Sequence, residues 1–312
     1  MITLKGYQLR VLASLCDFFR QAAKDGRPEE AFQAARRRNN FAPVPYLPVS
    51  SAAGLEPAMP YVCLRVPTGG GKTLLACHTA GLAMREFMHA DSAVVLWLVP
   101  SNTILDQTRD ALTDERHPYR RALELACGAV EVKSIEEALA LKRGDVEGQT
   151  VVIVSTIQAF RADDTTGRKV YDGKNGNMPD HFEGKPATLL AALEQGADGK
   201  PKNSLVNMLR MRRPIVIVDE AHNARTELSF AALGAVRPTC IVEFTATPSR
   251  GEVETAAGKK KPNPPSNVLH RVTAAELNAA QMVKLPLRVP AFEPRMNTNG
   301  TKMQPSVGVR PF

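Results

Sequence analysis

Cysteine is scarce in this sequence of 312 residues, and its cysteines are not paired. The five cysteines stand singly, and no two of them form a Cys-x-x-Cys pair: Cys16, Cys63, Cys77, Cys127 and Cys240. This pattern argues against a disulfide framework and against a zinc site, both of which need closely spaced ligands. We therefore expect reduced and mostly buried thiols, which fits a cytoplasmic protein.

Long apolar runs and internal repeats are also missing. Lys5, Gln8 and Arg10 interrupt the apolar residues at the start of the chain, which is not the pattern of a signal peptide. No apolar run approaches the roughly 20 residues of a membrane-spanning helix. A hydrophobic content of 44% and a charged content of 23% are typical of globular proteins. A length of 312 residues is enough for one large domain or two modest ones.

Acidic residues are scarce toward the end of the chain. The net charge is +8, and residues 250–312 hold ten Lys or Arg against four Glu, which gives this part +6. Such an excess favours a polyanionic partner, although it also serves solubility. We therefore expect this basic end to contact nucleic acid, with binding that weakens as the salt concentration rises.

The organising feature of the sequence is residues 66–73, which read VPTGGGKT. A β-branched run over 61–66 predicts a strand before it, and an apolar stripe over 74–84 predicts a helix after it. Strand, glycine-rich turn and helix form the context of a phosphate-binding loop. The glycines let backbone N–H groups point at a phosphate, and the helix adds the positive end of its dipole.

Carboxylates follow a second buried run. Residues 214–222 read PIVIVDEAH, so a parallel strand should end at Asp219 and Glu220. Two adjacent carboxylates would repel each other unless they shared a cation. Asp219 is placed to hold Mg²⁺ through its water shell, and Glu220 to orient or deprotonate a water molecule.

Three further strands end in polar residues. The runs 93–100, 151–160 and 240–248 place these side chains at or just beyond their carboxyl ends: Pro100, Ser101, Ser155, Thr156, Thr245 and Thr247. Taken singly, the first is also compatible with an ordinary strand-to-helix turn and the second with a strand end capped by Ser/Thr, while a lone Thr-Ala-Thr indicates nothing. Ligands of open α/β sheets bind at this edge.

Two polar stretches separate these elements. In residues 25–60 the basic run Arg36–Arg38 is followed by five prolines over 43–60, which predicts an insert whose basic run faces solvent. Residues 161–213 are rich in Gly, Asn and Lys, which predicts a surface excursion with a short helical patch over 187–194.

These motifs together carry a family resemblance. The segment PTGGGKT, with Val66 where the strict pattern has glycine, resembles motif I of the superfamily 2 helicases and translocases. Asp219-Glu220-Ala221-His222 resembles their DEAH box, Thr245-Ala246-Thr247 their motif III, and Tyr7-Gln8 their Gln motif. Together with residues 277–284, which read LNAAQMVK, these features look most like the Res subunit of type III restriction enzymes.

The resemblance implies an α/β fold: a RecA-like P-loop domain with a mostly parallel sheet, helices on both faces, and an incomplete second domain. We expect a Gln-motif helix and a Pro-rich insert over 1–60, the ATP-binding domain over 61–250, and a basic linker with the start of a truncated second domain over 251–312. About 60 residues follow motif III, whereas a second RecA-like domain needs on the order of 150. The chain is therefore expected to be the N-terminal part of a longer protein.

The resemblance also assigns roles to single residues. It names ATP and Mg²⁺ as cofactors and implies that Gln8 reads adenine. The remaining roles are triphosphate binding by Thr68, Gly69, Gly70, Gly71, Lys72 and Thr73, Mg²⁺ binding by Thr73 and Asp219, catalysis by Lys72, Asp219, Glu220 and His222, coupling by Thr245 and Thr247, and nucleic-acid contact by Pro100, Ser101, Ser155 and Thr156.

The implied function is that of the ATP-binding motor domain of a DNA helicase or translocase, which couples ATP hydrolysis to movement on DNA. The resemblance implies a methyltransferase/specificity subunit as a partner and no association with a membrane. An RNA or repair helicase of the same superfamily is the alternative within this class. A nucleic-acid-binding fragment that responds to nucleotide with little turnover is the alternative outside it. Without the arginine fingers of a second domain, which raise rates roughly 10³–10⁵-fold, the chain alone is expected to hydrolyse ATP slowly.

Overall fold

A seven-stranded sheet forms the centre of the computed structural model, which describes residues 3–48, 54–161, 168–173, 177–220, 227–249, 252–254, 260–262 and 265–282. The strand order is β3-β4-β2-β5-β6-β1-β9, and every neighbouring pair is parallel. The strands are β1 (Tyr61–Arg65), β2 (Val94–Val99), β3 (Val130–Lys133), β4 (Thr150–Thr156), β5 (Ile215–Asp219), β6 (Cys240–Thr245) and β9 (Val268–Arg271). A separate antiparallel pair joins β7 (Glu252–Glu254) and β8 (Lys260–Pro262). The predicted α/β class with a parallel sheet is confirmed.

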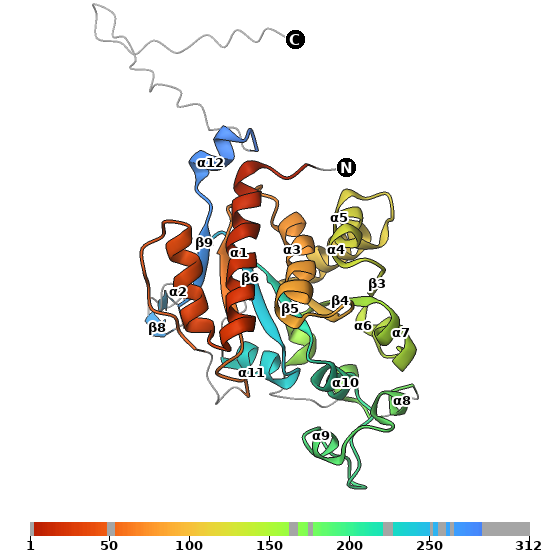
Figure 1. Ribbon diagram of the computed structural model, residues 1–312. Helices are drawn as coiled ribbons and strands as arrows, with labels where there is room; N and C mark the ends of the chain where they lie inside the picture. The colour runs from red at the N-terminus through yellow and green to blue at the C-terminus, as the bar shows by residue number, and fades with distance from the viewer. Residues whose placement is uncertain are drawn as a thin grey trace, which may run out of the picture.

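Helices cover both faces of this sheet (Figure 1). One face carries α1 (Gly6–Asp25), α2 (Pro28–Arg38), α3 (Lys72–Leu82) with the π-helical turn η2 (Ala83–Met88), α4 (Asn102–Thr113) and α5 (Pro118–Cys127). The opposite core includes α6 (Ile135–Ala138), α7 (Arg143–Gly148), η3 (Ile157–Phe160), η4 (Lys169–Tyr171), α8 (Pro179–Phe182), α10 (Leu205–Arg212) and α11 (Glu227–Ala235). The remaining helices are α9 (Ala187–Ala191) and α12 (Ala274–Ala279).

Strand β2 shows why the sequence folds into two cores. Its six residues are all buried and apolar, as expected of a parallel strand covered on both faces. Because successive side chains point to opposite faces, Val95, Trp97 and Val99 enter one core. Val94, Leu96 and Leu98 enter the other. Its pairing with β4 on one side and β5 on the other sets the register of the strand, and so sets where its carboxyl end lies.

The N-terminal insert is more ordered than the sequence suggested. Within it, α2 packs against α1, and Arg36 is buried instead of facing solvent as part of a basic run. Its guanidinium donates from Nη2 to Ala42 O at 2.6 Å and from Nη1 to Val268 O. The same group stacks between the rings of Phe32 and Phe41, 5.5 Å from each centroid. The solvated interpretation is therefore wrong for Arg36, and it holds for Arg37 and Arg38, which are exposed.

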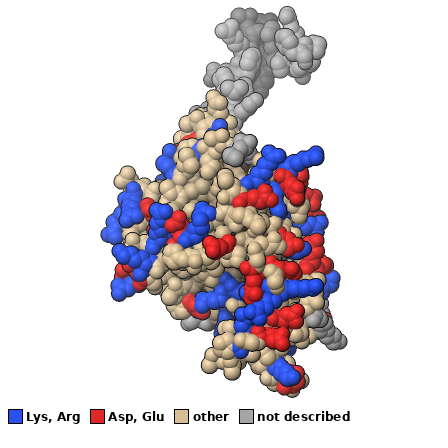
Figure 2. Space-filling view, turned by 45° about the vertical axis from the view of Figure 1, so that its right-hand side comes forward, with Lys and Arg blue, Asp and Glu red and all other residues tan. Residues whose placement is uncertain are grey.

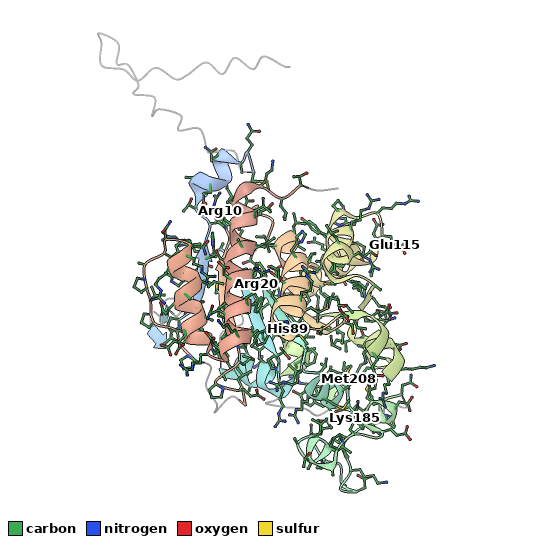
Figure 3. The ribbon with its side chains drawn as sticks, in the orientation of Figure 1. Arg10, Arg20, His89, Glu115, Lys185 and Met208 are labelled. Atoms are coloured by element: carbon green, nitrogen blue, oxygen red, sulfur yellow. The ribbon has the colours of Figure 1, made fainter. Side chains whose placement is uncertain are left out.

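Beyond residue 250, strand β9 joins the first sheet beside β1, which the sequence did not predict, and α12 follows it where the sequence over 272–280 predicts a short helix. Asn267 anchors this edge because its Nδ2 donates to Leu47 O and Tyr61 O at 2.9 and 3.1 Å. Ser14 on α1 contacts the Nδ1 of buried His270 on β9 at 2.6 Å. Arg10 and Glu276 then join α1 to α12 by a 2.7 Å ion pair; Figure 3 labels Arg10 beside α12. The sequence predicts a strand over 283–289, and this segment lies within residues 283–312, which are outside the described residues.

The stretch over 161–213 contributes to the second core as well as to the surface. Its buried members pack beside β4 and α10: Val170, Tyr171, Met178, Phe182, Leu193 and Leu205. The predicted helical patch is present as α9, and this helix has no buried residues. The stretch is therefore a surface excursion that is pinned to the domain by apolar side chains.

The structure bears on the expected state of the cysteines and on the expected lack of a membrane-spanning helix. All five cysteines are free thiols, and four of them are buried. Burial raises the pKa of the Cys127 and Cys240 thiols to about 12, so both stay protonated at neutral pH. In the described part of the chain, no helix has the length and apolarity needed to cross a membrane.

Burial of His270 predicts a pH-dependent stability. Desolvation lowers the pKa of His270 to about 4 in the folded chain, against about 6.5 in the unfolded chain. Below about pH 6.5 the histidine binds a proton in the unfolded state, whereas in the folded state it stays neutral until about pH 4. The free energy of unfolding therefore decreases as the pH falls from about 6.5 to 4. The expected loss is about 3 kcal/mol.

Urea unfolding at several pH values checks this expectation. The difference in unfolding free energy between the parent chain and His270→Asn should shrink as the pH falls through this window. His89→Asn is the control, because His89, labelled in Figure 3, is exposed and its left-handed backbone (φ 52°) suits asparagine. A difference between parent and His270→Asn that does not change with pH would contradict the role given to His270.

Candidate nucleotide-binding site

The glycine-rich loop joins the carboxyl end of β1 to α3. Its entry is fixed by Val66 N, which donates to Thr245 O at 3.0 Å, and α3 begins at Lys72. Gly69 and Gly71 have φ angles of 78° and 77°, which favour glycine. A Cβ on Gly70 would lie 2.6 Å from Val66 Cγ1 and 2.9 Å from Pro67 O. All three glycines are thus required by the backbone of this loop.

Helix α1 holds the loop from the side. Tyr7 donates its hydroxyl to Gly70 O at 2.9 Å, and Gln8 Nε2 donates to the same oxygen at 3.3 Å. Gln8 Oε1 accepts from Lys5 N at 2.9 Å. Gln8 is only 2% exposed, so it is not an ordinary solvent-facing glutamine at the start of a helix. Both ends of its amide are engaged here, and adenine recognition by Gln8 stays a prediction.

The carboxylates of β5 meet the lysine of the loop. Lys72 Nζ lies 2.5 Å from Glu220 Oε1, and the two side chains are 10% and 23% exposed. Glu220 has a left-handed backbone (φ 53°), an uncommon conformation for a residue other than glycine. This conformation ends the alternation of β5, whose next side chain would otherwise point to the opposite face from Asp219. The turn brings two carboxylates and one ammonium group together.

Asp219 is the buried member of this cluster. The pKa of Asp219 is raised to about 6, because the effect of burial exceeds the opposing effect of the Lys72 ammonium group and the Glu220 carboxylate adds to the rise. Asp219 Oδ1 is buried and has no hydrogen-bond partner among the described residues. An orphaned carboxylate oxygen is the kind of donor that Mg²⁺ prefers, and the Thr73 hydroxyl at the start of α3 is another. The loop and these donors fit a triphosphate with Mg²⁺.

The predicted nucleic-acid residues lie on the same edge of the sheet. Val99 pairs with Thr156, so the ends of β2 and β4 are side by side. Pro100 lines a cavity of about 20 Å³ together with Asp219 and Glu220, which connects this edge to the carboxylates. Ser101 caps α4, its Oγ accepting from Ile104 N at 3.4 Å, which is also what an ordinary strand-to-helix turn would show.

Ser155 and Thr156 lie farther along the edge, away from the glycine loop. Ser155 is buried and its Oγ donates to Thr156 O at 3.1 Å, whereas Thr156 is half-buried. Both residues line a larger cavity of about 330 Å³. The structure thus brings Pro100 to the carboxylates and separates Ser155 and Thr156 from them.

The predicted coupling residues lie beside the entry of the loop. Thr245 is buried and its Oγ1 accepts from Thr247 N at 3.1 Å, which closes the turn after β6. Thr247 is exposed. Their predicted partner, His222, lies outside the described residues. The structure therefore places the two threonines next to the loop, and their contact with His222 stays a prediction.

Two contacts on the glycine loop were missed by the sequence analysis. Tyr7 was noted only as part of a motif, yet its hydroxyl holds Gly70 O. Leu277 Cδ2 on α12 lies 3.6 Å from the point that a Cβ on Gly70 would occupy. A capping box marks this helix in the sequence, since Thr273 is followed three residues later by Glu276. No signal in the sequence shows that the helix folds back onto the loop.

The fold and the site define a RecA-like P-loop domain of the kind found in superfamily 2 motors. The chain belongs to the family of the type III restriction enzyme res subunit, because the model of this family matches residues 2–250. A search among curated proteins found no match.

Solved helicase-related structures show a remote likeness to this chain. The type ISP restriction-modification enzyme LlaGI, solved as a nuclease-deletion mutant with a DNA substrate mimic, is 15% identical with a TM-score of 0.42 over 90% of this chain. The UvsW helicase from bacteriophage T4 is 15% identical with a TM-score of 0.32 over 61% of this chain. The Sulfolobus solfataricus SWI2/SNF2 ATPase core, solved with dsDNA, is 15% identical with a TM-score of 0.30 over 60%. This chain spans 21%, 48% and 28% of those chains, respectively.

The ion pair between Lys72 and Glu220 predicts an effect of Glu220→Gln on nucleotide affinity. Lys72 must leave this carboxylate before it can reach a phosphate, so removing the negative charge should favour phosphate binding. We expect ATP to bind about fivefold more tightly, which corresponds to about 1 kcal/mol for a partly exposed pair.

Isothermal titration calorimetry with ATP and Mg²⁺ measures this effect. Glu56→Gln serves as the control, because it removes the partner of Arg213 in an exposed ion pair elsewhere on the surface and should leave the affinity unchanged. Weaker binding in Glu220→Gln would show that the carboxylate assists nucleotide binding instead of competing with it.

Proposed function

We propose that this chain is the ATP-dependent motor domain of a DNA translocase or helicase of the Res type. The observation that carries the proposal is the meeting of Lys72 with Asp219 and Glu220 at the end of a glycine loop. A lysine and two carboxylates at this edge of a parallel sheet suit the binding and hydrolysis of a nucleoside triphosphate.

The residues of the chain divide the work. Backbone N–H groups of Gly69, Gly70 and Gly71 and the N-terminus of α3 would receive the phosphates, as oriented amides favour anions. Lys72 would exchange Glu220 for the phosphate oxygens, and Glu220 would orient the attacking water. Thr73 and Asp219 would hold Mg²⁺, which supplies charge neutralisation for phosphoryl transfer when bound. Thr245 and Thr247, with His222, would report the nucleotide state to the rest of the edge.

DNA is the partner that family membership favours, and the net charge of +8 is compatible with a polyanion. Pro100, Ser101, Ser155 and Thr156 would touch the strand. By family resemblance, we also propose that the second motif acts as a DEAH box and that the metal is Mg²⁺. The same resemblance suggests a cytoplasmic location and a methyltransferase/specificity subunit as partner.

Nucleotide binding can be tested by thermal unfolding with ATP and Mg²⁺. At a hundredfold excess of ATP over Kd, binding should stabilise the fold by about 2.7 kcal/mol and raise the melting temperature. Lys72→Ala should remove most of this shift, because no other described cation lies at the loop in an ion pair with the carboxylates. Lys142→Ala, on the surface beside α7, is the control and should keep the full shift.

The outcome also separates the classes of function. A full shift in Lys72→Ala would remove Lys72 from the site. A normal shift with no phosphate release, even with DNA, would favour the nucleotide-responsive binding fragment. Equal or stronger stimulation by RNA would favour the RNA helicase of the same superfamily.

A further inference from the structure

The carbonyl oxygen of Gly70 is the point at which α1 holds the glycine loop. It accepts two hydrogen bonds from the first turn of this helix, one from the Tyr7 hydroxyl at 2.9 Å and one from Gln8 Nε2 at 3.3 Å. Tyr7 and Gln8 are each only 2% exposed, so water does not readily replace either donor. The direction of the carbonyl is therefore fixed, because turning it away would leave two buried donors without a partner.

The direction of the Gly70 oxygen also sets the direction of the next N–H group. The C=O of Gly70 and the N–H of Gly71 belong to one planar trans peptide unit, in which the two bonds point in opposite directions. Because the oxygen points toward α1, the N–H of Gly71 points away from it. This N–H donates to no acceptor among the described residues. Gly71 caps the start of α3, so its N–H joins the unpaired N–H groups that favour an anion there.

The glycines that shape the loop also make this peptide unit easy to turn over. A unit between two glycines turns at little steric cost, because neither residue carries a Cβ. Turned over, it would present the Gly70 carbonyl to the phosphates, with its partial negative charge, in place of the Gly71 N–H. One hydrogen bond of ordinary strength to the carbonyl favours the observed orientation by about fivefold.

Tyr7 is the more permanent of the two donors. The bond from Gln8 to Gly70 is the longer one, and Gln8 is also engaged at Oε1, which accepts from Lys5 N at 2.9 Å. Turning the Gln8 amide toward a base, as the family resemblance implies, would break its bond with Gly70. Burial raises the pKa of the Tyr7 phenol above its ordinary value, so the hydroxyl stays protonated and donates at neutral pH.

The packing of α1 fixes Tyr7 in turn. Tyr7 belongs to the same apolar core as Val11 and Leu15 on α1 and Leu75 on α3. Its ring therefore does not follow the loop when Gly70 turns, and its hydroxyl is a fixed point against which the carbonyl is held.

We propose that Tyr7 is a positioning residue of the nucleotide site. Through the Gly70 carbonyl, its hydroxyl keeps the peptide unit 70–71 turned so that the N–H of Gly71 faces the phosphates. Gln8 shares this task, and Tyr7 retains it when Gln8 turns to a base. The inference rests on the proposed function and deepens it, because it gives a role in phosphate binding to a side chain that does not touch the nucleotide.

The surface charge makes the orientation of single groups important. On the face seen in Figure 2, basic and acidic side chains are interspersed, and no broad field of one sign covers it. The affinity for a triphosphate therefore depends on the groups of the loop more than on the net charge of +8.

Isothermal titration calorimetry of the full chain tests the inference with two ligands, ATP and inorganic tripolyphosphate, each with Mg²⁺. Tyr7→Phe removes the hydroxyl and keeps the ring in the core. It should weaken the binding of both ligands by the same factor, about fivefold, because the peptide unit acts on the phosphates and not on the base.

Tyr171→Phe is the matched control. The Tyr171 hydroxyl also donates to a backbone carbonyl, Phe160 O at 2.8 Å, and the residue is buried in the core on the opposite face of the sheet. Each substitution removes one buried hydrogen bond and should lower the melting temperature of the free chain. Tyr171→Phe should nevertheless keep the parent affinity for both ligands.

Nuclear magnetic resonance with isotope-labelled glycine reports the N–H group directly. In the parent chain, the Gly71 amide proton should move downfield when ATP and Mg²⁺ bind, because it donates to a charged phosphate oxygen. In Tyr7→Phe this change should be smaller. Gly26 is the reference, because it lies at the far end of α1 and its N–H already donates to Ala22 O at 3.0 Å.

The outcomes separate the inference from the proposed function. If Tyr7→Phe binds both ligands as the parent chain does, the inference is overturned while the proposed function stands. A loss of affinity for ATP but not for tripolyphosphate would place Tyr7 at the base, and an equal loss in Tyr171→Phe would make the effect one of general stability; either result overturns the inference. If the parent chain binds neither ligand, the proposed function fails together with it.

Discussion

The parallel direction of all seven strands is the constraint on which the site depends. Parallel strands place their carboxyl ends on one edge, and the segments that follow β1, β5, β6, β2 and β4 therefore leave from the same side. The pairings keep these ends level: Leu64 with Phe244, and Phe244 with Asp219. The glycine loop and the carboxylates meet because their strands are two positions apart, with β6 between them.

The glycine loop is held by segments that are remote in the sequence. Tyr7 and Gln8 bind its Gly70 carbonyl from α1, Thr245 accepts the Val66 N–H from β6, and Leu277 packs close to Gly70 from α12. Helices α1 and α12 are themselves joined by the ion pair of Arg10 with Glu276. The loop is therefore confined on several sides before any ligand is bound, which lowers the entropic cost of ordering it around a phosphate.

Much of this could be predicted from the sequence, because the signals are local. A buried apolar run predicts a strand, and the glycines and carboxylates that follow it identify the motif, as at Lys72 and Asp219. What could not be predicted depends on long-range packing. Arg36 is part of an apparently solvated run, yet the rings of Phe32 and Phe41 and the carbonyl oxygens of Ala42 and Val268 bury it. Strand β9 is four residues long, and its place beside β1 is set by Asn267 and His270, not by its own periodicity.

The return of β9 to the sheet has a mechanical consequence. The polypeptide runs from the edge strand through α12, and Met282 N donates back to Leu277 O at 2.9 Å. A force that pulls on the chain after Met282 would therefore act on Leu277 first. Because Leu277 lies close to Gly70, this force would reach the glycine loop before it reached the sheet. The parallel strand pairing of β9 with β1 would resist such a load in shear, with several hydrogen bonds strained together. Tension along the backbone would thus reach the phosphate cradle through Leu277 and, by the ion pair of Glu276 with Arg10, through α1.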